Sequence, residues 1–391
     1  MPNYDVVIAG GSISGLLAAR EIAAGGLSVA VLEEDAEIGT PEHCGGLVSI
    51  SGIRDLGIVP DLDTIQNNRI AYANIFSPSS SFEISAERQK VIVLDRRTFD
   101  KQIAFQAQKK GAEIRVKCSM RSFEKEGSQY IVKTSEGNFL CNFFVDARGI
   151  ASIISRNRDG ILQSAQYEIY ASWIEPHSIE VVFNSQLYPG FFAWIIPTGR
   201  GRGKVGVAGR RINAASALQS YMDRKGKYSI VRKVFAPIWI NGPLRTFILD
   251  KTIIVGDAAG QSKPTTAGGI YSCGMGGVLA GRALVKAANK KNDDRQKQQM
   301  LLKEYERGWL SMFKPEFDKM LLARRLLERM DNRAIDDLIS AIPPEVIQEA
   351  SIDSDFDFHS TALAKILGAK GAARMAKALF GNEVRRLIPE S

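Results

Sequence analysis

The sequence is poor in histidine and has no paired cysteines. Its three histidines are His43, His177 and His359. Their spacing does not suit metal ligands, which argues against a histidine-rich metal site or a hydrolase triad. The four cysteines, Cys44, Cys118, Cys141 and Cys273, lie far apart without a CxxC pair. We therefore expect reduced thiols, no disulfide framework and no metal, so that redox chemistry would require a borrowed cofactor.

Long apolar runs are also missing. No stretch of about 18 apolar residues occurs, and the N-terminus enters a β-type run without a basic region or a cleavage site. These absences predict a cytoplasmic protein with no membrane span. The formal charge of +8 is spread along the chain. It is interpreted mainly as solvated charge, with an anionic membrane surface or an anionic substrate as alternatives and no nucleic-acid partner.

The chain opens with the pattern of a strand, a glycine turn, a helix and a second strand. Residues 4–9 are an apolar β-type run, residues 16–24 are helix-like, and residues 28–32 form the second strand, which ends at Glu33. This order within about 30 residues is typical of a βαβ unit that binds a dinucleotide. The expected contacts in the turn are Gly10, Gly11, Ser12, Ile13, Ser14 and Gly15.

One glycine of this first motif is replaced, and an acidic residue follows it. Ser12 stands where the G-x-G-x-x-G pattern has its second glycine, although its small side chain still permits close approach of the backbone. Glu33 is expected to accept hydrogen bonds from ribose hydroxyls, with Glu34 as the fallback and a merely solvated carboxylate as the alternative.

A second glycine turn lies far along the chain. Gly256, Asp257 and Gly260 follow a strand at residues 252–255 and precede a helix-like run at residues 268–288. A carboxylate at that strand end can bind a ribityl hydroxyl, and the helix N-terminus with Gly268, Gly269 and Ile270 can present backbone amides to a cofactor. A plain turn is the alternative, but the two turns together favour a nucleotide cofactor.

The remaining patterns predict an α/β fold, α+β overall. We expect a Rossmann-like nucleotide domain, an inserted, mostly antiparallel β-sheet domain for the substrate, and a C-terminal helical region. The expected boundaries are 1–68, 94–160 and 250–290 for the nucleotide domain, 69–93 and 161–249 for the substrate domain, and 291–391 for the helical region.

Five segments carry a resemblance to a known family. They are GGSISG with Glu33, EIGTPEHCGG at residues 37–46, LDRRTFD at 94–100, PGFFAWIIP at 189–197 and GDAAGQSKPTTAGGI at 256–270. Over roughly residues 4–290 the chain resembles the FAD-dependent superfamily of aromatic hydroxylases, flavin halogenases and geranylgeranyl reductases. It is most similar to the geranylgeranyl reductases, because Cys44 and Gly45 match their Cys-Gly pair beside the flavin.

The resemblance implies further site residues. Arg96 would contact the flavin, with an ordinary surface ion pair of Arg96 or Arg97 as the alternative. Cys44 would tune the flavin or supply a proton, with a small buried thiol as the alternative. Residues 146–149 would form a backbone turn near the flavin, although Arg148 replaces an acidic residue of relatives. The expected lining of the substrate channel is Phe191, Phe192, Trp194, Ile195 and Ile196, where Ile196 replaces an aromatic of the family signature.

The function implied is reduction of C=C bonds in geranylgeranyl or other isoprenoid lipid chains by hydride from reduced FAD. A flavin-dependent monooxygenase or halogenase is the alternative, and a flavoprotein that only presents a prenyl lipid is another. Since no second dinucleotide motif is present, electrons would come from transient NAD(P)H or from ferredoxin.

A basic amphipathic pattern near the C-terminus suggests peripheral contact with an anionic membrane, or an ordinary helix packed on the body. Its basic residues are Lys365, Lys370, Arg374, Lys377, Arg385 and Arg386.

Overall fold

The computed structural model describes residues 1–154, 159–289, 295–353 and 355–358. Its first sheet has the order β18-β19-β11-β1-β2-β8, in which every neighbouring pair is parallel except β18 and β19. A hairpin of β9 and β10 extends β11 on one side. The strands are β1 (Asn3–Ala9), β2 (Val29–Leu32), β8 (Glu113–Arg115), β9 (Met120–Glu126), β10 (Gln129–Thr134), β11 (Gly137–Asp146), β18 (Ile248–Leu249) and β19 (Thr252–Ile254).

Strand β1 shows why this sheet is central. Val6 and Ile8 pack into one hydrophobic cluster and Val7 into another on the opposite face, as expected for a strand covered on both sides. The larger cluster receives α1 (Ile13–Ala24), α3 (Arg96–Lys109) and α6 (Ile270–Ala288). The expected return of the chain to this sheet near residue 253 is confirmed by the pairing of β19 with β11.

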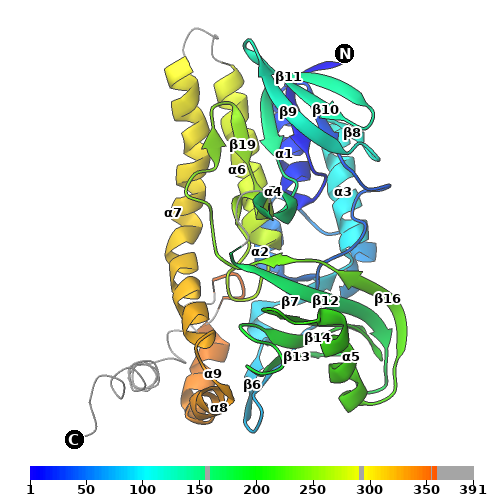
Figure 1. Cartoon of the computed structure of the whole chain (residues 1–391), viewed down its shortest axis with the longest axis vertical. Coiled ribbons are helices and arrows are strands. Elements are labelled where there is room, and N and C mark those ends of the chain that lie inside the picture. Colours follow the sequence, from blue (N-terminus) through cyan, green and yellow to red (C-terminus); the bar gives the residue numbers. More distant parts are fainter. Residues whose placement is uncertain (155–158, 290–294, 354, 359–391) are drawn as a thin grey trace, which may run out of the picture.

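The second sheet is mostly antiparallel and has the order β16-β12-β15-β14-β13-β5-β6, with β17 beside β12. Helix α5 (Ala214–Lys225) covers one face through Leu218 and Met222. The strands are β5 (Tyr72–Phe76), β6 (Ser81–Ser85), β12 (Ile161–Tyr170), β13 (Ser178–Phe183), β14 (Phe192–Gly199), β15 (Arg202–Gly209), β16 (Ser229–Phe235) and β17 (Ile238–Trp239). Figure 1 places this sheet at the opposite end of the molecule from the β9–β10 hairpin.

Short elements join the two sheets. A three-stranded sheet contains β3 (Leu47–Ser49), β4 (Ile65–Asn67) and β7 (Val91–Leu94). Also here are α2 (Ile50–Asp55), α4 (Ile150–Ile154) and the 3-10 turns η1 (Leu62–Thr64), η2 (Glu87–Gln89) and η3 (Gly256–Ala259). The predicted arrangement of a Rossmann-like unit with an inserted, mostly antiparallel sheet is confirmed.

The C-terminal part is helical. Helix α7 (Arg295–Leu327) lies beside α6 along one flank and reaches from the first sheet toward the second (Figure 1). Helices α8 (Asn332–Ser340) and α9 (Pro344–Asp353) follow. None of the helices in the described ranges is long and apolar enough to span a bilayer. The basic pattern at residues 363–386 lies outside the described residues.

Candidate functional site

The first glycine turn has no room for a side chain at Gly10 or at Gly15. Gly10 has a φ of +107°, and a Cβ there would lie 2.3 Å from the Ala147 carbonyl oxygen. A Cβ on Gly15 would lie 2.1 Å from the Gly10 carbonyl oxygen. Ser12 caps α1 in an extended conformation, is exposed, and makes no side-chain bond to the helix amides. The positive N-terminus of α1 is therefore open to an anionic group such as a diphosphate.

Other predicted residues of this turn point inward. The Ile13 and Ser14 side chains are buried beneath the turn, so they could reach a ligand only through backbone atoms. Ala147, in the turn predicted at residues 146–149, packs against Gly10. Arg148 in the same turn pairs with the buried Asp146 at 2.8 Å instead of pointing freely into solvent.

Of the two candidate acids after β2, only Glu33 adjoins the glycine turn. Its Oε2 accepts a hydrogen bond of 2.7 Å from the Gly11 amide, and its Oε1 accepts one of 3.0 Å from the Asp35 amide. Burial raises the pKa of Glu33, although these amide hydrogen bonds oppose the rise. Glu34 is exposed and lies 3.5 Å from the Ser119 hydroxyl. The geometry thus places Glu33 at the first motif and Glu34 outside it.

The second glycine turn lies directly against the first. Gly256 has a φ of +68°, and a Cβ there would lie 2.3 Å from Ser14 Oγ. Behind this contact, a Cβ on Gly277 of α6 would lie 2.1 Å from the Ser14 carbonyl oxygen. The two turns, separated by more than two hundred residues of sequence, therefore meet where the N-terminal ends of α1 and η3 converge.

Asp257 and the start of α6 form the other wall of this region. The Asp257 carboxylate accepts a hydrogen bond of 3.3 Å from the Cys273 thiol. Its side chain is accessible to solvent, and partial desolvation by the surrounding residues raises its pKa. Gly269 caps α6, next to Gly268 and the buried Ile270. Cys273 was missed from the sequence, because nothing in its helical surroundings distinguishes it from a core residue.

Cys44 is half-buried and lies beside Gly46 and Arg96. The Gly46 amide donates to its sulfur at 3.3 Å, and the Arg96 guanidinium is close enough to interact with it electrostatically. Arg96 also makes a two-pronged ion pair with Asp100 at 2.8 and 2.9 Å, in which both side chains are largely buried. The alternative of a surface ion pair for Arg96 is therefore wrong, because the pair lies inside the molecule.

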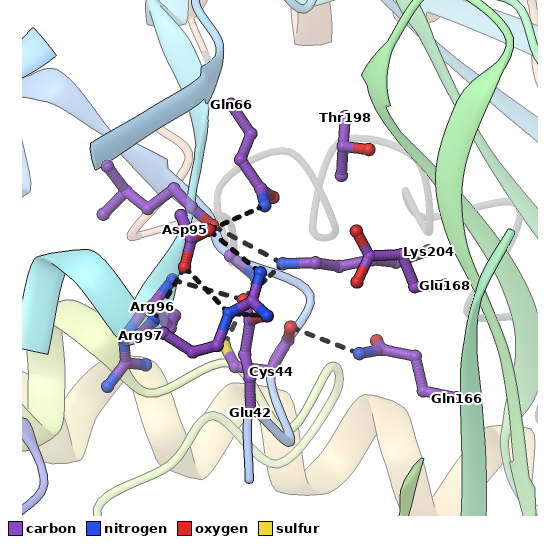
Figure 2. Close-up of polar contacts among 12 residues, drawn as sticks. Glu42, Cys44, Gln66, Asp95, Arg96, Arg97, Gln166, Glu168, Thr198 and Lys204 are labelled. Carbon is purple, nitrogen blue, oxygen red and sulfur yellow. Dashed lines mark hydrogen bonds and ion pairs between the residues drawn. The ribbon is translucent and has the colours of Figure 1, made fainter. Parts of the chain in front are cut away.

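A chain of hydrogen bonds ties Cys44 to the second sheet. Trp194 Nε1 donates to Gln166 Oε1 at 3.2 Å, and Gln166 Nε2 donates to the Cys44 carbonyl oxygen at 3.2 Å. Figure 2 shows Gln166 reaching across to Cys44. Gly45 allows close contact as well, since a Cβ there would lie 2.5 Å from the Ile196 side chain.

The predicted substrate strand presents alternate residues to this region. Trp194 and Ile196 of β14 pack in a cluster with Val91 and Val93 of the three-stranded sheet. Phe191 and Phe192, which stack with ring centroids 4.1 Å apart, lie in an adjoining cluster that also includes Trp194. Ile195 points the other way, into the cluster covered by α5. The expectation that Ile195 lines the channel is therefore wrong, because successive residues of a strand face opposite sides.

A network of charged residues beside Cys44 was not predicted. Lys204 of β15 is completely buried and donates a hydrogen bond of 2.5 Å to the buried Glu42. Arg232 of β16 donates to the other Glu42 oxygen at 2.7 Å (Figure 2 shows Glu42 and Lys204). Burial alone would raise the pKa of Glu42, but these two cations hold it below its usual value. The sequence offered no signal, because the partners are 162 and 190 residues away.

The segment at residues 355–358 contacts the loop that follows the second glycine turn, which was also unexpected. Lys263, in the loop between the second glycine turn and α6, donates a hydrogen bond of 3.0 Å to the Phe356 carbonyl oxygen. Asp357 lies 3.8 Å from Lys263 and accepts a hydrogen bond from Ser49. The Phe356 side chain packs on the cluster that contains Ile196.

Comparisons with known proteins agree with this geometry. No family model matches the chain. Digeranylgeranylglycerophospholipid reductase 2 of Methanothermobacter thermautotrophicus is 29% identical over 360 residues, which cover 87% of this chain and 92% of the relative. Digeranylgeranylglycerophospholipid reductase 1 of Methanosphaera stadtmanae is 30% identical over 314 residues, which cover 75% of this chain and 77% of the relative.

Solved structures share the fold. A geranylgeranyl bacteriochlorophyll reductase-like protein from Thermoplasma acidophilum superposes with a TM-score of 0.84 and 23% identity, over 99% of this chain and 100% of the other. A flavin-dependent brominase superposes with a TM-score of 0.67 and 18% identity, over 98% and 99% of the two chains. Taken with the sequence identities, these matches show that the chain belongs to the geranylgeranyl reductase family of FAD-dependent oxidoreductases.

Proposed function

We propose that this chain binds FAD and uses the reduced flavin to saturate C=C bonds in the prenyl chains of a digeranylgeranylglycerophospholipid. The observation that carries the proposal is the contact between the two glycine turns at Ser14 and Gly256. The names of the relatives supply the substrate class. Trp194 of β14 is linked to Cys44 through Gln166, and Phe192 packs in the same hydrophobic cluster as Trp194.

The residues present fit FAD. The turn at Gly10 and Gly15 leaves a cradle that a Cβ would fill, and the open N-terminus of α1 suits the diphosphate. Glu33 retains lone pairs for a ribose hydroxyl, and the accessible carboxylate of Asp257 suits a ribityl hydroxyl. Further proposed contacts are Gly11, Ser12, Ile13, Ser14, Gly45, Arg96, Gly268, Gly269 and Ile270, with Glu34 set aside by its outward position.

We also propose a division of labour between domains that follows the predicted boundaries. Residues 1–68, 94–160 and 250–290 would hold FAD, and residues 69–93 and 161–249 would hold the substrate. The pairing of β5 and β6 with the second sheet supports this assignment.

The difficult step in reducing an isolated alkene is protonation, because the hydrocarbon offers no electron sink. Bound reduced FAD supplies the hydride to one alkene carbon, and the other carbon needs a proton. The Cys44 thiol is our candidate donor: its Sγ–H bond breaks as the C–H bond forms. The thiolate left behind would lie beside the positive Arg96. Phe191, Phe192, Trp194 and Ile196 would keep water from this step.

The function is tested with the purified full chain. We expect a yellow protein that retains FAD and, after anaerobic reduction with dithionite, converts a digeranylgeranylglycerophospholipid to products heavier by one H₂ per reduced bond. Mass spectrometry identifies those products. A chain that fails to take up FAD, or whose reduced flavin passes no electrons to any prenyl lipid, would contradict the proposal, and the second result would favour a lipid-presenting flavoprotein.

Cys44→Ala tests the proposed proton donor. We expect single-turnover oxidation of the reduced flavin by substrate to slow by about a hundredfold, while the dithionite reduction of FAD stays unchanged. Cys118→Ala is the matched control, because Cys118 is buried among residues of the β9–β11 region, where its thiol meets Thr134. An unchanged rate in Cys44→Ala would reject the active role.

The electron donor and membrane contact are proposed more broadly. NAD(P)H or a reduced ferredoxin would visit transiently, and comparing both in multiple-turnover assays identifies the donor. The basic pattern at residues 363–386 would contact anionic lipid, so a chain truncated after Phe358 should lose flotation with anionic liposomes.

The shared fold with a brominase makes a flavin monooxygenase or halogenase the second candidate. Rapid reoxidation of the reduced flavin by O₂ that yields a hydroxylated or brominated product would favour this candidate. Alkene reduction, together with flavin reoxidation by O₂ that yields no such product, would favour the reductase.

A further inference from the structure

One face of the second sheet changes from apolar to charged along its strands. On β14, Phe192, Trp194 and Ile196 lie in hydrophobic clusters on the face opposite α5, and the polar Thr198 follows them along the strand. On the neighbouring β15, Gly206 lies opposite Trp194 and Lys204 lies opposite Ile196, so they share this face. The face is therefore aromatic at one end and polar at the other, with Cys44 contacting it between the two.

The polar end collects cations that remain partly accessible. The side chains of Arg97, Arg202 and Arg232 are 35%, 36% and 24% exposed, respectively. With the buried Lys204 they face three carboxylates, so the cluster carries a net positive charge. The carboxylates are those of Glu42, Asp95 and Glu168.

Two buried polar atoms in this cluster lack partners. Gln66 Oε1 and Arg232 Nε make no hydrogen bond within the part of the chain that the structure describes, which contains only one other such side-chain atom. Gln66 belongs to the cluster because its Nε2 donates to Asp95 at 3.3 Å. Figure 2 shows Gln66 and Thr198 pointing toward the same region as Glu168 and Lys204. Because both atoms are buried, a ligand would reach them only after neighbouring side chains shift; their lack of partners shows that the polar groups of this cluster are not fully satisfied by the chain alone.

We propose that Arg97, Arg202 and Arg232 bind the phosphate of the lipid headgroup, while the prenyl chains extend toward Phe192 and Trp194. This inference rests on the proposed function, because an amphipathic phospholipid matches a face with one charged and one aromatic end. Guanidinium groups suit phosphate because they offer parallel N–H donors. The phosphate would fix which part of the prenyl chain reaches the reducing site beside Cys44.

Arg202 is the best residue to test, since it is accessible and only loosely tied, 3.8 Å from Glu168 and 3.3 Å from Thr198. We expect Arg202→Met to raise KM for a phosphorylated digeranylgeranylglycerol by about tenfold with kcat unchanged. KM for the neutral alcohol geranylgeraniol should change less than twofold. Arg202→Lys should recover part of the loss, because the charge remains. The matched control is Arg200→Met, which removes an exposed arginine two positions away.

Each outcome separates this inference from the proposed function. If the wild-type chain reduces neither lipid, the proposed function fails. If it reduces both but Arg202→Met leaves KM for the phosphorylated lipid unchanged, or raises KM equally for both lipids, the headgroup site is wrong. If Arg202→Met weakens turnover driven by NADPH but not by dithionite, the cluster binds the electron donor and the headgroup site is again wrong.

Discussion

The two sheets are joined to their surroundings by different kinds of contact. Around the first sheet, backbones touch where glycines leave out a side chain, as Gly15 does against Gly10 and Gly277 against Ser14. Around the second sheet, long charged side chains bridge the space, as Lys204 and Arg232 do to Glu42. The first region depends on close backbone contacts that only glycine permits, and the second depends on ion pairs between charged side chains.

The difference has an energetic consequence. A glycine contact fails when an atom is added, because packed backbones cannot separate locally without moving a helix. A buried ion pair fails when a partner is removed, because the remaining charge is left in a poorly solvated site. Adding a side-chain atom at a glycine should therefore destabilise the first region, and removing a charged side chain should destabilise the second.

The largest expected effect is at the buried ion pair. Lys204→Met should lower the free energy of unfolding by about 3–5 kcal/mol, because it leaves Glu42 with less compensation in the interior. Denaturant unfolding at a fixed FAD concentration, followed by circular dichroism, measures the change. The comparison variant is Lys314→Met, which removes an exposed ion pair with Asp318 and should cost less than about 0.5 kcal/mol.

A double-mutant cycle sharpens this result. Glu42→Gln with Lys204→Met should cost less than the sum of the two single changes, since the double variant leaves neither charge of the pair unpaired. Strict additivity would mean that the two side chains do not act as a pair.

The next effect is at the helix contact of the first region. Gly277→Ala places a Cβ 2.1 Å from the Ser14 carbonyl oxygen, so α6 must move away from α1. We expect a loss of about 1–3 kcal/mol and weaker FAD binding, because Ser14 also contacts Gly256 of the second turn. Flavin fluorescence titration measures the affinity. Unchanged stability and affinity would show that the two turns do not depend on this contact.

This contrast also explains what the sequence could predict. The turns at Gly10 and Gly256 were visible because their geometry demands glycine at fixed local positions, flanked by a strand and a helix. Period-two alternation was equally visible on β14, but the face toward α5 is set by tertiary packing, so Ile195 was assigned to the wrong side. Arg96 and Asp100 stand four residues apart on one helix, a spacing that could have revealed their ion pair.

The charged network and the C-terminal contacts left no local trace. Glu42 and Lys204 are ordinary residues in their own segments and meet only because β15 lies over the Cys44 loop. Asp357 reaches Ser49 across 308 residues of sequence. Pairings of this kind follow from the assembled fold, so a single sequence gave no reason to propose them.

The two regions should also respond to pH with opposite signs. The folded-state pKa of Glu42 is lowered, although burial opposes this, because Lys204 and Arg232 favour the carboxylate. Its stabilising contribution is present above its ordinary pKa of 4.5 and is lost as the pH falls through the lower folded value. Glu42→Gln should therefore destabilise the protein strongly at pH 7 and progressively less in acid.

Asp257 should show the reverse in the protein without FAD. Burial raises its folded pKa above 3.8, so ionisation favours the unfolded chain as the pH rises. Asp257→Asn should stabilise the apoprotein only slightly at pH 7, because water screens this accessible carboxylate, and should lose that advantage in acid. Parallel denaturation series from pH 3 to pH 7 measure the change in unfolding free energy that each substitution causes. If these two changes varied with pH in the same direction, the distinction between the regions would be wrong.

The smallest expected effect is at a glycine that has room for a side chain. Gly308 lies within α7, and a Cβ there would meet Leu279 at 3.7 Å, an ordinary van der Waals distance. Gly308→Ala should raise stability by about 0.5–1 kcal/mol, because alanine loses less backbone entropy in a helix. Thermal unfolding beside Gly277→Ala measures the difference. If Gly308→Ala raises the unfolding temperature and Gly277→Ala lowers it, then close backbone approach, and not glycine as a residue type, distinguishes the first region. Destabilisation by Gly308→Ala would instead show that α7 also requires glycine for close packing.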